Sequence, residues 1–410
     1  MKRRENLIVG LDIGTTKVCA MVGEVTDTGV DIVGFGEVPS TGLRKGVVIN
    51  IDATVAAIEQ AVEEAERMAG CEIHTVYAGI GGGHIRSLNS HGIVAVKERE
   101  VGAQDVVRVL DAAQAIAIPM DREVIHIIPQ EYIIDDQDGI RDPQGMSGVR
   151  LAAKVHIVTG AVTSAQNIVK CCEKTGLHVR DLVLNLIASA EAVLTQDEKE
   201  LGVLLVDIGG GTTDIAVFAN GSVQHTAVLP LGGDHITRDI AIGLGTPTAD
   251  AEEIKRRYGC ASTQLIEDDG PLDIPGVGGR KSRSISRRML AEIIEPRVEE
   301  MLALVTEELA RSGLEDMLPT GVVITGGSTE LNGMVETAER VFGMSVRKGL
   351  PTGVGGLAEE VHAPAFSAPV GLVLFGLHKV QNDDPRLKGR EDNLYRRMKS
   401  RMEEWIANIF

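Results

Sequence analysis

Residues 11–17 read LDIGTTK, and residues 206–213 read VDIGGGTT. Each stretch closes an apolar run typical of a buried strand, at residues 7–11 and 203–208, and each leads into another strand pattern. A turn of Gly and hydroxyl residues after a strand directs backbone N–H groups and hydroxyls at one point, which suits phosphate. The repeat therefore predicts two related domains whose hairpins clamp a triphosphate. The alternative is that both are ordinary hairpin turns.

A carboxylate stands near the end of each strand, Asp12 in the first copy and Asp207 in the second. Mg²⁺ prefers oxygen ligands and usually keeps several of its waters. We therefore predict Asp12 and Asp207 as the catalytic-site carboxylates that hold Mg²⁺ through water.

Further Gly-rich turns extend this site. Residues 321–328, GVVITGGS, predict a strand followed by a turn small enough for close approach to adenine or ribose, and residues 231–234, LGGD, form another Gly turn. Glu252 and Lys255 lie three apart on a predicted helix, so they share a face and are candidates for ribose and adenine contacts, with a solvated ion pair as the alternative. The predicted ATP-binding residues are Gly14, Thr15, Thr16, Lys17, Gly209, Gly210, Gly211, Thr212, Thr213, Gly232, Gly233, Glu252, Lys255, Gly326, Gly327 and Ser328.

Composition excludes several classes of protein. The chain has 410 residues, enough for two compact domains, and its net charge of −18 argues against nucleic acid as the main partner. The five cysteines have no zinc-site spacing, which predicts thiols in a reducing cytoplasm. The apolar stretch at 7–11 is too short for a signal peptide, and no run approaches the ~20 apolar residues that span a bilayer. Any membrane contact is expected to be peripheral.

An amphipathic pattern occupies residues 394–410, after a polar stretch at 381–393 that reads as a flexible linker. Its large apolar side chains recur at helical spacing on one face, with basic residues beside them. This pattern predicts a helix that lies in the membrane interface. The alternative is a helix docked on the protein's own core. The predicted membrane residues are Leu394, Met398, Lys399, Arg401, Met402, Trp405, Ile406, Ile409 and Phe410.

The two phosphate loops and the Gly-Gly-Ser turn resemble, in their order, those of actin, sugar kinases and heat-shock chaperone ATPases. Within that superfamily the chain is similar to the FtsA family of bacterial cell-division proteins along essentially its full length. The stretches that carry this resemblance are residues 7–16, 129–160, 200–218, 245–259, 290–305 and 322–333. The resemblance implies an α/β, actin-like (ribonuclease H-like) fold of two domains, in which a subdomain called 1C replaces the usual 1B.

The same resemblance implies a division of the chain into subdomains. Subdomain 1A takes residues 1–85 and 163–200, with a return at 363–380, and 1C is inserted at 86–162. Subdomain 2A takes residues 201–235 and 305–362, and 2B, mostly helical with an irregular loop at 266–282, takes 236–304. The linker at 381–393 and the amphipathic helix at 394–410 follow.

The FtsA resemblance also implies a function. Such a protein binds ATP, polymerises as an actin-like filament on the cytoplasmic face of the inner membrane at the division site, and anchors FtsZ through its terminal helix. The FtsZ C-terminal tail would bind subdomain 2B, where the helix at 286–305 offers Arg288, Glu295 and Arg297. Later division proteins would bind subdomain 1C.

One position departs from relatives that hydrolyse ATP briskly. They carry Glu or Gln to orient water where Asn185 stands here, and Glu191 lies more than one helical turn further on. We therefore expect slow hydrolysis or none. A small-molecule kinase of this fold has no use for the terminal helix. A PilM-like pilus-assembly protein is the alternative with this fold, and that family lacks the helix.

Overall fold

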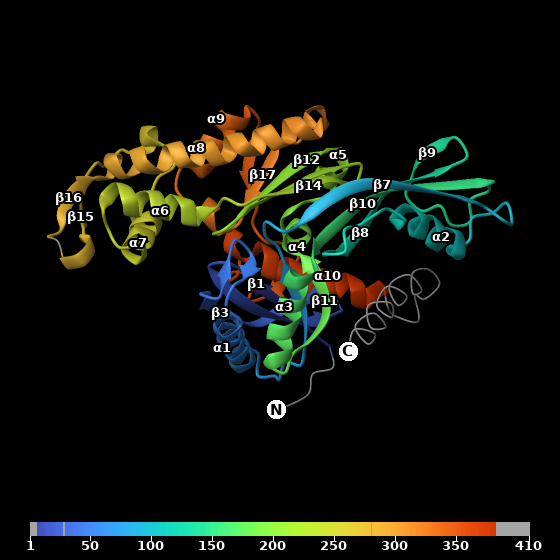
Figure 1. Cartoon of the computed structure of the whole chain (residues 1–410), viewed down its shortest axis with the longest axis horizontal. Coiled ribbons are helices and arrows are strands. Elements are labelled where there is room, and N and C mark those ends of the chain that lie inside the picture. The colour runs from blue at the N-terminus through green and yellow to red at the C-terminus, as the bar shows by residue number, and fades with distance from the viewer. Residues whose placement is uncertain (1–5, 28, 280, 383–410) are drawn as a thin grey trace.

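The computed structural model describes residues 6–27, 29–279 and 281–382. The predicted terminal helix at 394–410 and most of the predicted linker lie outside the described residues. Figure 1 shows two halves, each built around its own sheet, with a third sheet projecting to one side.

The first half contains a six-stranded sheet in the order β11-β6-β1-β2-β3-β19. β1, β2 and β3 form an antiparallel meander, while β6 lies parallel to β1 and β11 parallel to β6. The strands are β1 (Leu7–Ile13), β2 (Lys17–Thr26), β3 (Gly29–Pro39), β6 (Thr75–Ile80), β11 (His178–Leu184) and β19 (Gly355–Gly356); β4 (Leu43–Arg44) and β5 (Val47–Val48) pair separately. The strand predicted at residues 7–11 is confirmed.

Helices cover this sheet on both faces. α1 begins at a cap in which the Asn50 side chain accepts the Ala53 N–H at 3.1 Å, and it ends at Gly70, whose left-handed conformation suits glycine. Apolar residues recur at helical spacing over 53–68, which favours an amphipathic helix, and α1 contains this stretch. The helices of this half are α1 (Ile51–Ala69), α3 (Val162–Lys174), α4 (Asn185–Val193) and α10 (Ser367–Asn382).

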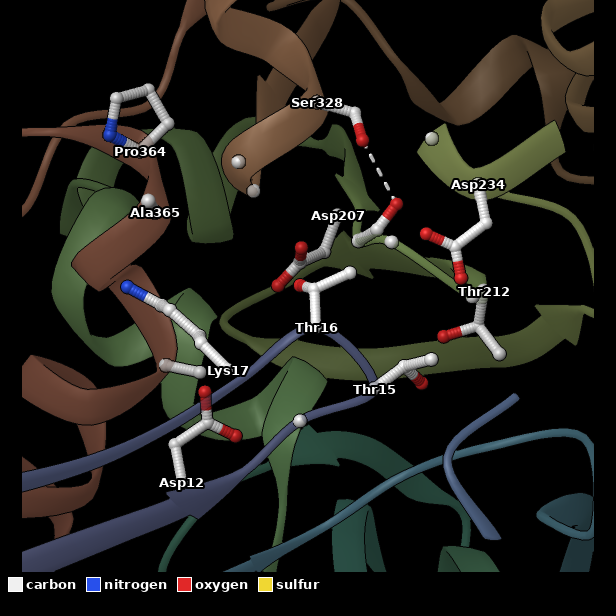
Figure 2. A pocket seen from close by; sticks show the side chains of 18 of the residues that line it. Asp12, Thr15, Thr16, Lys17, Asp207, Thr212, Asp234, Ser328, Pro364 and Ala365 are labelled. Atoms are coloured by element: carbon white, nitrogen blue, oxygen red, sulfur yellow. Dashed lines mark hydrogen bonds between the residues drawn. The ribbon is translucent and has the colours of Figure 1, made fainter. Parts of the chain in front are cut away.

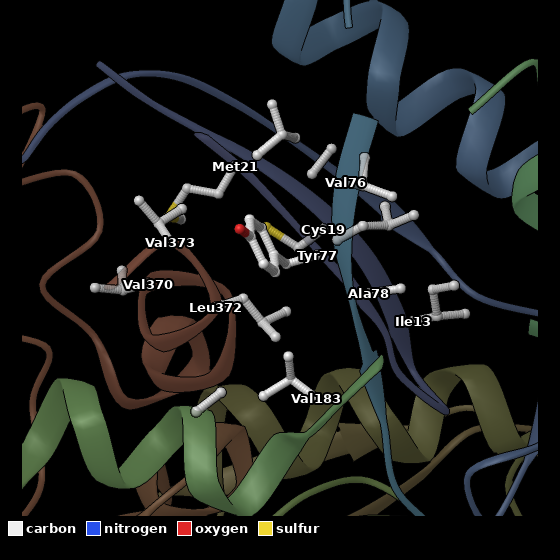
Figure 3. Packing of buried hydrophobic residues seen from close by; sticks show 14 of the residues in the cluster. Ile13, Cys19, Met21, Val76, Tyr77, Ala78, Val183, Val370, Leu372 and Val373 are labelled. Atoms are coloured by element: carbon white, nitrogen blue, oxygen red, sulfur yellow. The ribbon is translucent and has the colours of Figure 1, made fainter. Parts of the chain in front are cut away.

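α10 packs deeply into the first half. Figure 3 shows Leu372 and Val373 of α10 beside Met21, Cys19 and Tyr77 of the sheet. Glycines allow this approach, because a Cβ at Gly371 would lie 1.7 Å from the Ala188 carbonyl oxygen of α4. α10 therefore joins β1 and α4, the two elements that carry Asp12 and Asn185.

The second half repeats the arrangement of the first. Its five-stranded sheet has the order β14-β13-β12-β17-β18, again an antiparallel meander with two parallel strands beside its first strand. The predicted pair of related domains is thus confirmed, as are the strands predicted at 203–208 and 322–325. The strands are β12 (Val203–Ile208), β13 (Thr213–Ala219), β14 (Ser222–Leu229), β17 (Val322–Thr325) and β18 (Val346–Lys348), with helices α5 (Gln196–Leu201) and α9 (Met334–Phe342).

A helical layer lies over one end of the second half. It consists of α6 (Gly233–Leu244), α7 (Thr248–Tyr258) and the long α8 (Arg287–Ser312). The loop predicted at 266–282 is irregular only in part, because β15 (Pro271–Ile274) pairs with β16 (Arg283–Ser286) as a short hairpin. Short 3₁₀ helices are η1 (Thr263–Leu265), η2 (Val277–Gly279), η3 (Glu315–Met317), η4 (Gly327–Glu330) and η5 (Pro364–Phe366).

The third sheet interrupts the first half between β6 and α3, and we call it the inserted domain. It contains β7 (Arg86–Ala95), β8 (Arg122–Ile134), β9 (Gln137–Ile140) and β10 (Arg150–Ala161), ordered β7-β10-β8-β9, with α2 (Ala103–Gln114) packed against it. Most of its buried residues form an apolar cluster of their own, while Val158 of β10 belongs to the core of the first half. In Figure 1 this domain extends past the edge of the second half, where β14 lies.

Candidate nucleotide-binding site

The same hydrogen bond closes both phosphate loops. In the first, the Gly14 N–H donates to the Lys17 carbonyl at 2.9 Å, and in the second the Gly209 N–H donates to the Thr212 carbonyl at 2.9 Å. The repeated sequence therefore folds into the same turn twice, once at the end of β1 and once at the end of β12.

The two loops touch across the gap between the halves. A Cβ at Gly210 would lie 2.2 Å from Thr16 Cγ2, and a Cβ at Gly211 would lie 2.7 Å from Thr15 Oγ1. Figure 2 shows Thr15 and Thr16 on one ribbon facing Asp207 and Thr212 on the other. Only glycine fits between them, so the two facing hairpins predicted from the sequence are confirmed as a structural arrangement.

A cavity of about 480 Å³ lies between the loops, which is within the usual range of small-molecule sites. Fourteen of the sixteen predicted ATP-binding residues line it; Thr213 and Gly232 do not. The Thr213 hydroxyl donates to the Leu231 carbonyl, and Gly232 packs against the Gly209 and Gly210 carbonyls. These two residues support the second loop from behind.

One helix, α4, holds the carboxylates of both halves. The Asn185 Nδ2–H donates to Asp12 Oδ1 at 3.0 Å, and the Ser189 hydroxyl donates to Asp207 Oδ2 at 2.7 Å. Asn185 and Ser189 are four residues apart, so they lie on the same helix face. The two carboxylates predicted to hold Mg²⁺ are therefore both oriented from one element.

Burial controls the charge of these carboxylates. It raises the pKa of Asp12 to about 6, while Lys17 opposes the rise. The pKa of Asp207 is also raised by burial. Asp214, which the sequence analysis missed although it directly follows the second motif, has its pKa raised to about 8, by burial first and Asp207 second.

Two buried oxygen atoms at the cavity have no hydrogen-bond partner among the described residues, Asn185 Oδ1 and Asp214 Oδ1. Unpaired buried acceptors are costly, so each indicates a place for a missing partner such as water or a cation. Together with the glycine-lined gap, they fit a magnesium–nucleotide complex. No group of three or more His, Cys, Asp or Glu side chains in the described part of the chain is placed to hold a metal alone.

Lys17 has its own partners at the rim of the cavity. Its Nζ lies 2.8 Å from Glu37 Oε2 and 4.1 Å from the centre of the Phe366 ring. Figure 2 shows Lys17 between Asp12 and the segment that carries Pro364 and Ala365. The sequence analysis missed Pro364–Phe366, because no local pattern connects a segment so late in the chain with the first phosphate loop.

Glu252 and Lys255 lie in a network rather than in solvent. Lys255 is only 13% exposed, and its Nζ lies 2.7 Å from Glu252 Oε2, 2.9 Å from Thr237 Oγ1 and 3.2 Å from the Gly233 carbonyl. The Ser328 hydroxyl donates to the Gly209 carbonyl at 2.9 Å, which ties the Gly-Gly-Ser turn to the second loop. These residues form the wall opposite the first half.

The structure separates Asn185 from Glu191. Asn185 lines the cavity, whereas Glu191 accepts from Lys199 Nζ at 3.1 Å and does not line it. Asn185, which we expect at the position of the water-orienting residue, thus lies at the cavity, and Glu191 does not.

The three residues predicted for the FtsZ tail lie on two sides of α8. Arg288 donates to the Thr263 and Ile266 carbonyls, and Glu295 accepts the Thr263 N–H on that same side. Arg297 instead pairs with Asp239 of α6 at 2.5 Å. The structure brings Arg288 and Glu295 together but not Arg297.

Two further predictions concern solvent and membrane. All five cysteines lie within the described residues and are buried thiols. Of the helices in the described part of the chain, none has the length and apolarity to cross a bilayer. The predicted membrane residues at 394–410 lie outside the described residues.

Comparison with known proteins gives consistent matches. A family model described as cell division protein FtsA matches residues 204–371, and one described as the SHS2 domain inserted in FTSA matches residues 82–159. The cell division protein FtsA of Pseudomonas aeruginosa is 57% identical over 374 residues, covering 91% of this chain and 90% of the relative. That of Escherichia coli K12 is 43% identical over 412 residues, covering 98% of each.

Solved structures with low sequence identity show the same fold. A PilM–PilN type IV pilus biogenesis complex matches with a TM-score of 0.66 at 17% identity, covering 90% of this chain and 98% of that one. MreB5 of Spiroplasma citri bound to ADP matches with a TM-score of 0.57 at 14% identity, covering 93% and 98%. The predicted actin-like α/β fold is confirmed by these likenesses, which concern the fold alone.

Proposed function

The chain belongs to the FtsA family of cell-division proteins, as the sequence resemblance predicted, and from this premise we propose that it binds ATP with Mg²⁺ between its two halves. The observation that carries the proposal is the pair of identical turns that meet across a glycine-lined cavity of about 480 Å³. Turns of this kind present backbone N–H groups to phosphate.

Each part of the cavity has a role in this proposal. The loops at Gly14–Thr16 and Gly209–Thr212 bind the phosphates, and Asp12 and Asp207 hold Mg²⁺ through water. The bound ion supplies positive charge that offsets the phosphate oxygens and the buried carboxylates. Gly326–Ser328, with Glu252 and Lys255, form the adenosine side.

We further propose that hydrolysis is slow. Asn185 Oδ1 can accept a hydrogen bond from a water, but the Asn side chain is one methylene shorter than Glu or Gln, and unlike Glu it cannot take up the proton. A water that is oriented less well reacts more slowly, so ATP stays bound for longer. Slow hydrolysis suits a protein that acts in its ATP-bound state rather than by repeated turnover of ATP.

Titration with a fluorescent ATP analogue, with Mg²⁺ and with a chelator, tests nucleotide binding. We expect saturable binding that is tighter with Mg²⁺. The absence of saturable binding in both conditions would contradict the proposal.

The family also supports a role as a membrane adaptor of the division machinery. We propose that residues 394–410 form the amphipathic helix that holds the chain on the cytoplasmic face of the inner membrane at the division site, where the chain forms actin-like filaments. Burying large apolar side chains contributes up to about 1.5–3 kcal/mol each at full burial, so one helix binds reversibly and polymerisation adds avidity.

Co-sedimentation with liposomes in the presence of ATP tests the anchor. The full chain is compared with one truncated after Lys388, on anionic and on neutral lipid. We expect the full chain to pellet and the truncated chain to stay soluble. Trp405→Glu is expected to lose lipid binding. Ser400→Glu, a change at a polar position of the same segment, is the matched control and is expected to retain it. If the full chain and the truncated chain both stay soluble, the anchor proposal fails.

We propose that the helical layer of the second half binds the FtsZ C-terminal tail and that the inserted domain binds later division proteins. Because Arg288 and Arg297 lie on two sides of α8, charge reversal at each tests the two faces separately. Fluorescence anisotropy with a labelled tail peptide measures the effect. Unchanged affinity in both Arg288→Glu and Arg297→Glu would remove α8 from the proposed site.

A PilM-like role in pilus assembly has less support. The PilM–PilN complex shares 17% identity with this chain, whereas the FtsA proteins share 40–57% over 86–100% of their length. The similarity to PilM therefore supports a shared fold and does not support a shared function.

A further inference from the structure

The inserted domain is attached covalently to the first half and is hydrogen-bonded to both halves. On the first half, the Leu184 N–H of β11 donates to His126 Nε2 of β8 at 2.9 Å, and Val158 of β10 packs in the first-half core. The domain's β7 follows β6 of the first half through Gly81, Gly82 and Gly83, and its β10 runs directly into α3. Gly81 and Gly82 also line the nucleotide cavity. A triglycine connection is conformationally permissive, so this attachment permits rotation beside the nucleotide site.

Toward the second half, the inserted domain donates hydrogen bonds to the edge strand β14. The Ser87 hydroxyl donates to the Thr226 carbonyl at 2.8 Å, and Asn89 Nδ2–H donates to the Gln224 carbonyl at 3.1 Å. Gln130 Nε2–H donates to the Val223 carbonyl at 2.9 Å. We call these contacts, with those of His156 described next, the seam.

His156 lies at the centre of the seam and is 1% exposed. Its Nδ1 lies 2.6 Å from Asn89 Oδ1 and its Nε2 lies 2.9 Å from Thr226 Oγ1. Burial lowers the pKa of His156 to about 4, so the ring is neutral and one nitrogen donates while the other accepts. Opening the seam would separate Nε2 from Thr226 of β14, whereas Nδ1 would keep Asn89, which lies on β7 of the same domain. The lost partner of a buried ring nitrogen is a cost of opening.

The seam differs from an ordinary sheet junction. In the described part of the chain, β14 pairs with β13 and β7 with β10, and the contacts between β14 and the inserted domain run through side chains. Side chains hold β14 at residues 223–226 without making the two sheets one continuous sheet. The inserted domain thus keeps its own sheet and is fixed through side chains to β14 of the second half as well as to β11 of the first.

β14 is in turn rigidly connected to the second phosphate loop. Its end at Leu229 pairs with Thr213, and two residues further on the Thr213 hydroxyl donates to the Leu231 carbonyl. Next, the Gly233 N–H donates to the Gly209 carbonyl at 2.9 Å. A displacement of the second phosphate loop therefore moves β14 with it.

We propose that ATP, by drawing the two halves together, turns the inserted domain about its triglycine connection, because the seam makes the domain follow the second half. The outer end of the domain, at α2 and β9, then changes position with nucleotide state. This inference rests on the proposed nucleotide binding. By reciprocity, a protein partner that prefers one position of the inserted domain changes ATP affinity by the same factor.

A distance measurement across the domain tests the inference. Glu63 on α1 and Asp138 on β9 are exposed, and both are replaced by cysteine for spectroscopic labels. The five native cysteines are buried, so the two introduced thiols take the label, and the otherwise native chain serves as the labelling control. In the full chain, we expect Mg-ATP to shift the distance distribution.

The same measurement in Thr226→Val tests the seam, because this change keeps the volume and removes the hydroxyl that bonds His156. We expect the ATP-induced shift to be lost or strongly reduced. Thr337→Val is the matched control, since Thr337 is equally buried and donates to the Ala261 carbonyl far from the seam. It should keep the full shift. If Thr226→Val does not fold, the distance is measured instead in Gln130→Ala, which removes the hydrogen bond to the Val223 carbonyl and should also reduce the ATP-induced shift.

ATP binding is measured on the same samples with a fluorescent analogue, which separates the two ways of failing. A chain that binds ATP without a shift in distance overturns the inference and leaves nucleotide binding intact. An unreduced shift in the seam variants overturns it as well. A chain that binds no ATP overturns the proposed function and, with it, this inference.

Discussion

The two phosphate loops come from sheets with the same strand order, yet their carboxylates differ in electrostatic surroundings. Asp12 has the Lys17 ammonium nearby, which holds its pKa down against burial. Asp207 has Asp214 as its neighbour, and burial raises the pKa of both carboxyls. The repeat therefore reproduces the backbone turn but not its electrostatic surroundings. At neutral pH the Asp214 carboxyl is protonated, and a bound cation would favour its charged form.

The comparison also shows how one element serves both loops. α4 contributes Asn185 to Asp12 and Ser189 to Asp207, so the two carboxylates keep their spacing only if α4 stays in place. α10 packs on α4 at Gly371 and borders the cavity at its first turn. The geometry of the site therefore depends on core packing in the first half.

The largest effect on ATP affinity is expected from a side chain added at Gly232, which packs against the carbonyls of the second phosphate loop. In Gly232→Ala, the new Cβ would lie 2.6 Å from the Gly209 and Gly210 carbonyls, so the backbone of the phosphate loop must move. We expect ATP affinity to fall roughly 100-fold, about 3 kcal/mol, measured by titration. Gly102→Ala is the control, since its Cβ would meet only Asp105 Oδ2 at 3.7 Å among the described residues and does not border the cavity. Equal affinity in both variants would contradict the contact.

The raised pKa of Asp214 predicts a dependence of stability on pH without Mg²⁺. The pKa of Asp214 is raised from 3.8 to about 8, so between these values the folded state binds more protons than the unfolded state. The free energy of unfolding therefore falls as pH rises. From pH 7 to 8 we expect a loss of about 1 kcal/mol, which should be absent in Asp214→Asn.

Urea unfolding in a chelator at pH 7 and 8.5 measures this difference. The window lies above pH 6.5 because desolvation lowers the pKa of His84, His126 and His156 to about 4, and these groups act in the opposite sense below that pH. It also lies above the pKa of Asp12, about 6, whose contribution to the slope has then ended. An equal fall in both proteins would show that Asp214 is not its source.

Asn185 and Ser189, the two residues of α4 that donate hydrogen bonds to the carboxylates, provide a matched pair of variants. Asn185→Ala and Ser189→Ala each remove one hydrogen bond to a carboxylate, and such bonds contribute about 1.5–3 kcal/mol. We expect each to weaken Mg-ATP binding about tenfold, because the carboxylate loses its orientation, and to leave binding in a chelator nearly unchanged. Ser164→Ala in α3 is the control, a buried serine away from the cavity. An equal loss without Mg²⁺ would mean that the tethers act on the nucleotide directly.

The phosphate loops could be predicted from the sequence because local patterns encode them. A buried strand followed by Gly and Thr fixes a turn, and the repetition of residues 11–16 at 206–213 implied that two such turns face each other. Asp214 could have been found by reading one residue beyond the motif. The prediction of Gly232 and Thr213 as cavity residues was too broad, since they support the loop from behind.

Other features depend on tertiary contacts that leave no local pattern. Nothing near Ser189 indicates that it bonds a carboxylate of the other half, and Phe366 reaches Lys17 only because α10 returns to the first half. The two sides of α8 illustrate the same limit. Helical spacing placed Arg288 and Arg297 on one element, but their partners, the Thr263 carbonyl and Asp239, come from segments distant in sequence.

The smallest effect is expected at Lys17, and it distinguishes two roles for this residue. Lys17 Nζ is held by Glu37 at 2.8 Å and by the Phe366 ring, so part of its charge is already engaged. If it acts through Asp12, Lys17→Met raises the pKa of that carboxyl and weakens Mg-ATP binding only about threefold, ~0.7 kcal/mol. Glu37→Gln, which frees the ammonium, should then leave affinity unchanged or slightly tighter. A loss of roughly 100-fold in Lys17→Met would instead make Lys17 a direct phosphate ligand and give the first loop the stronger hold on the nucleotide.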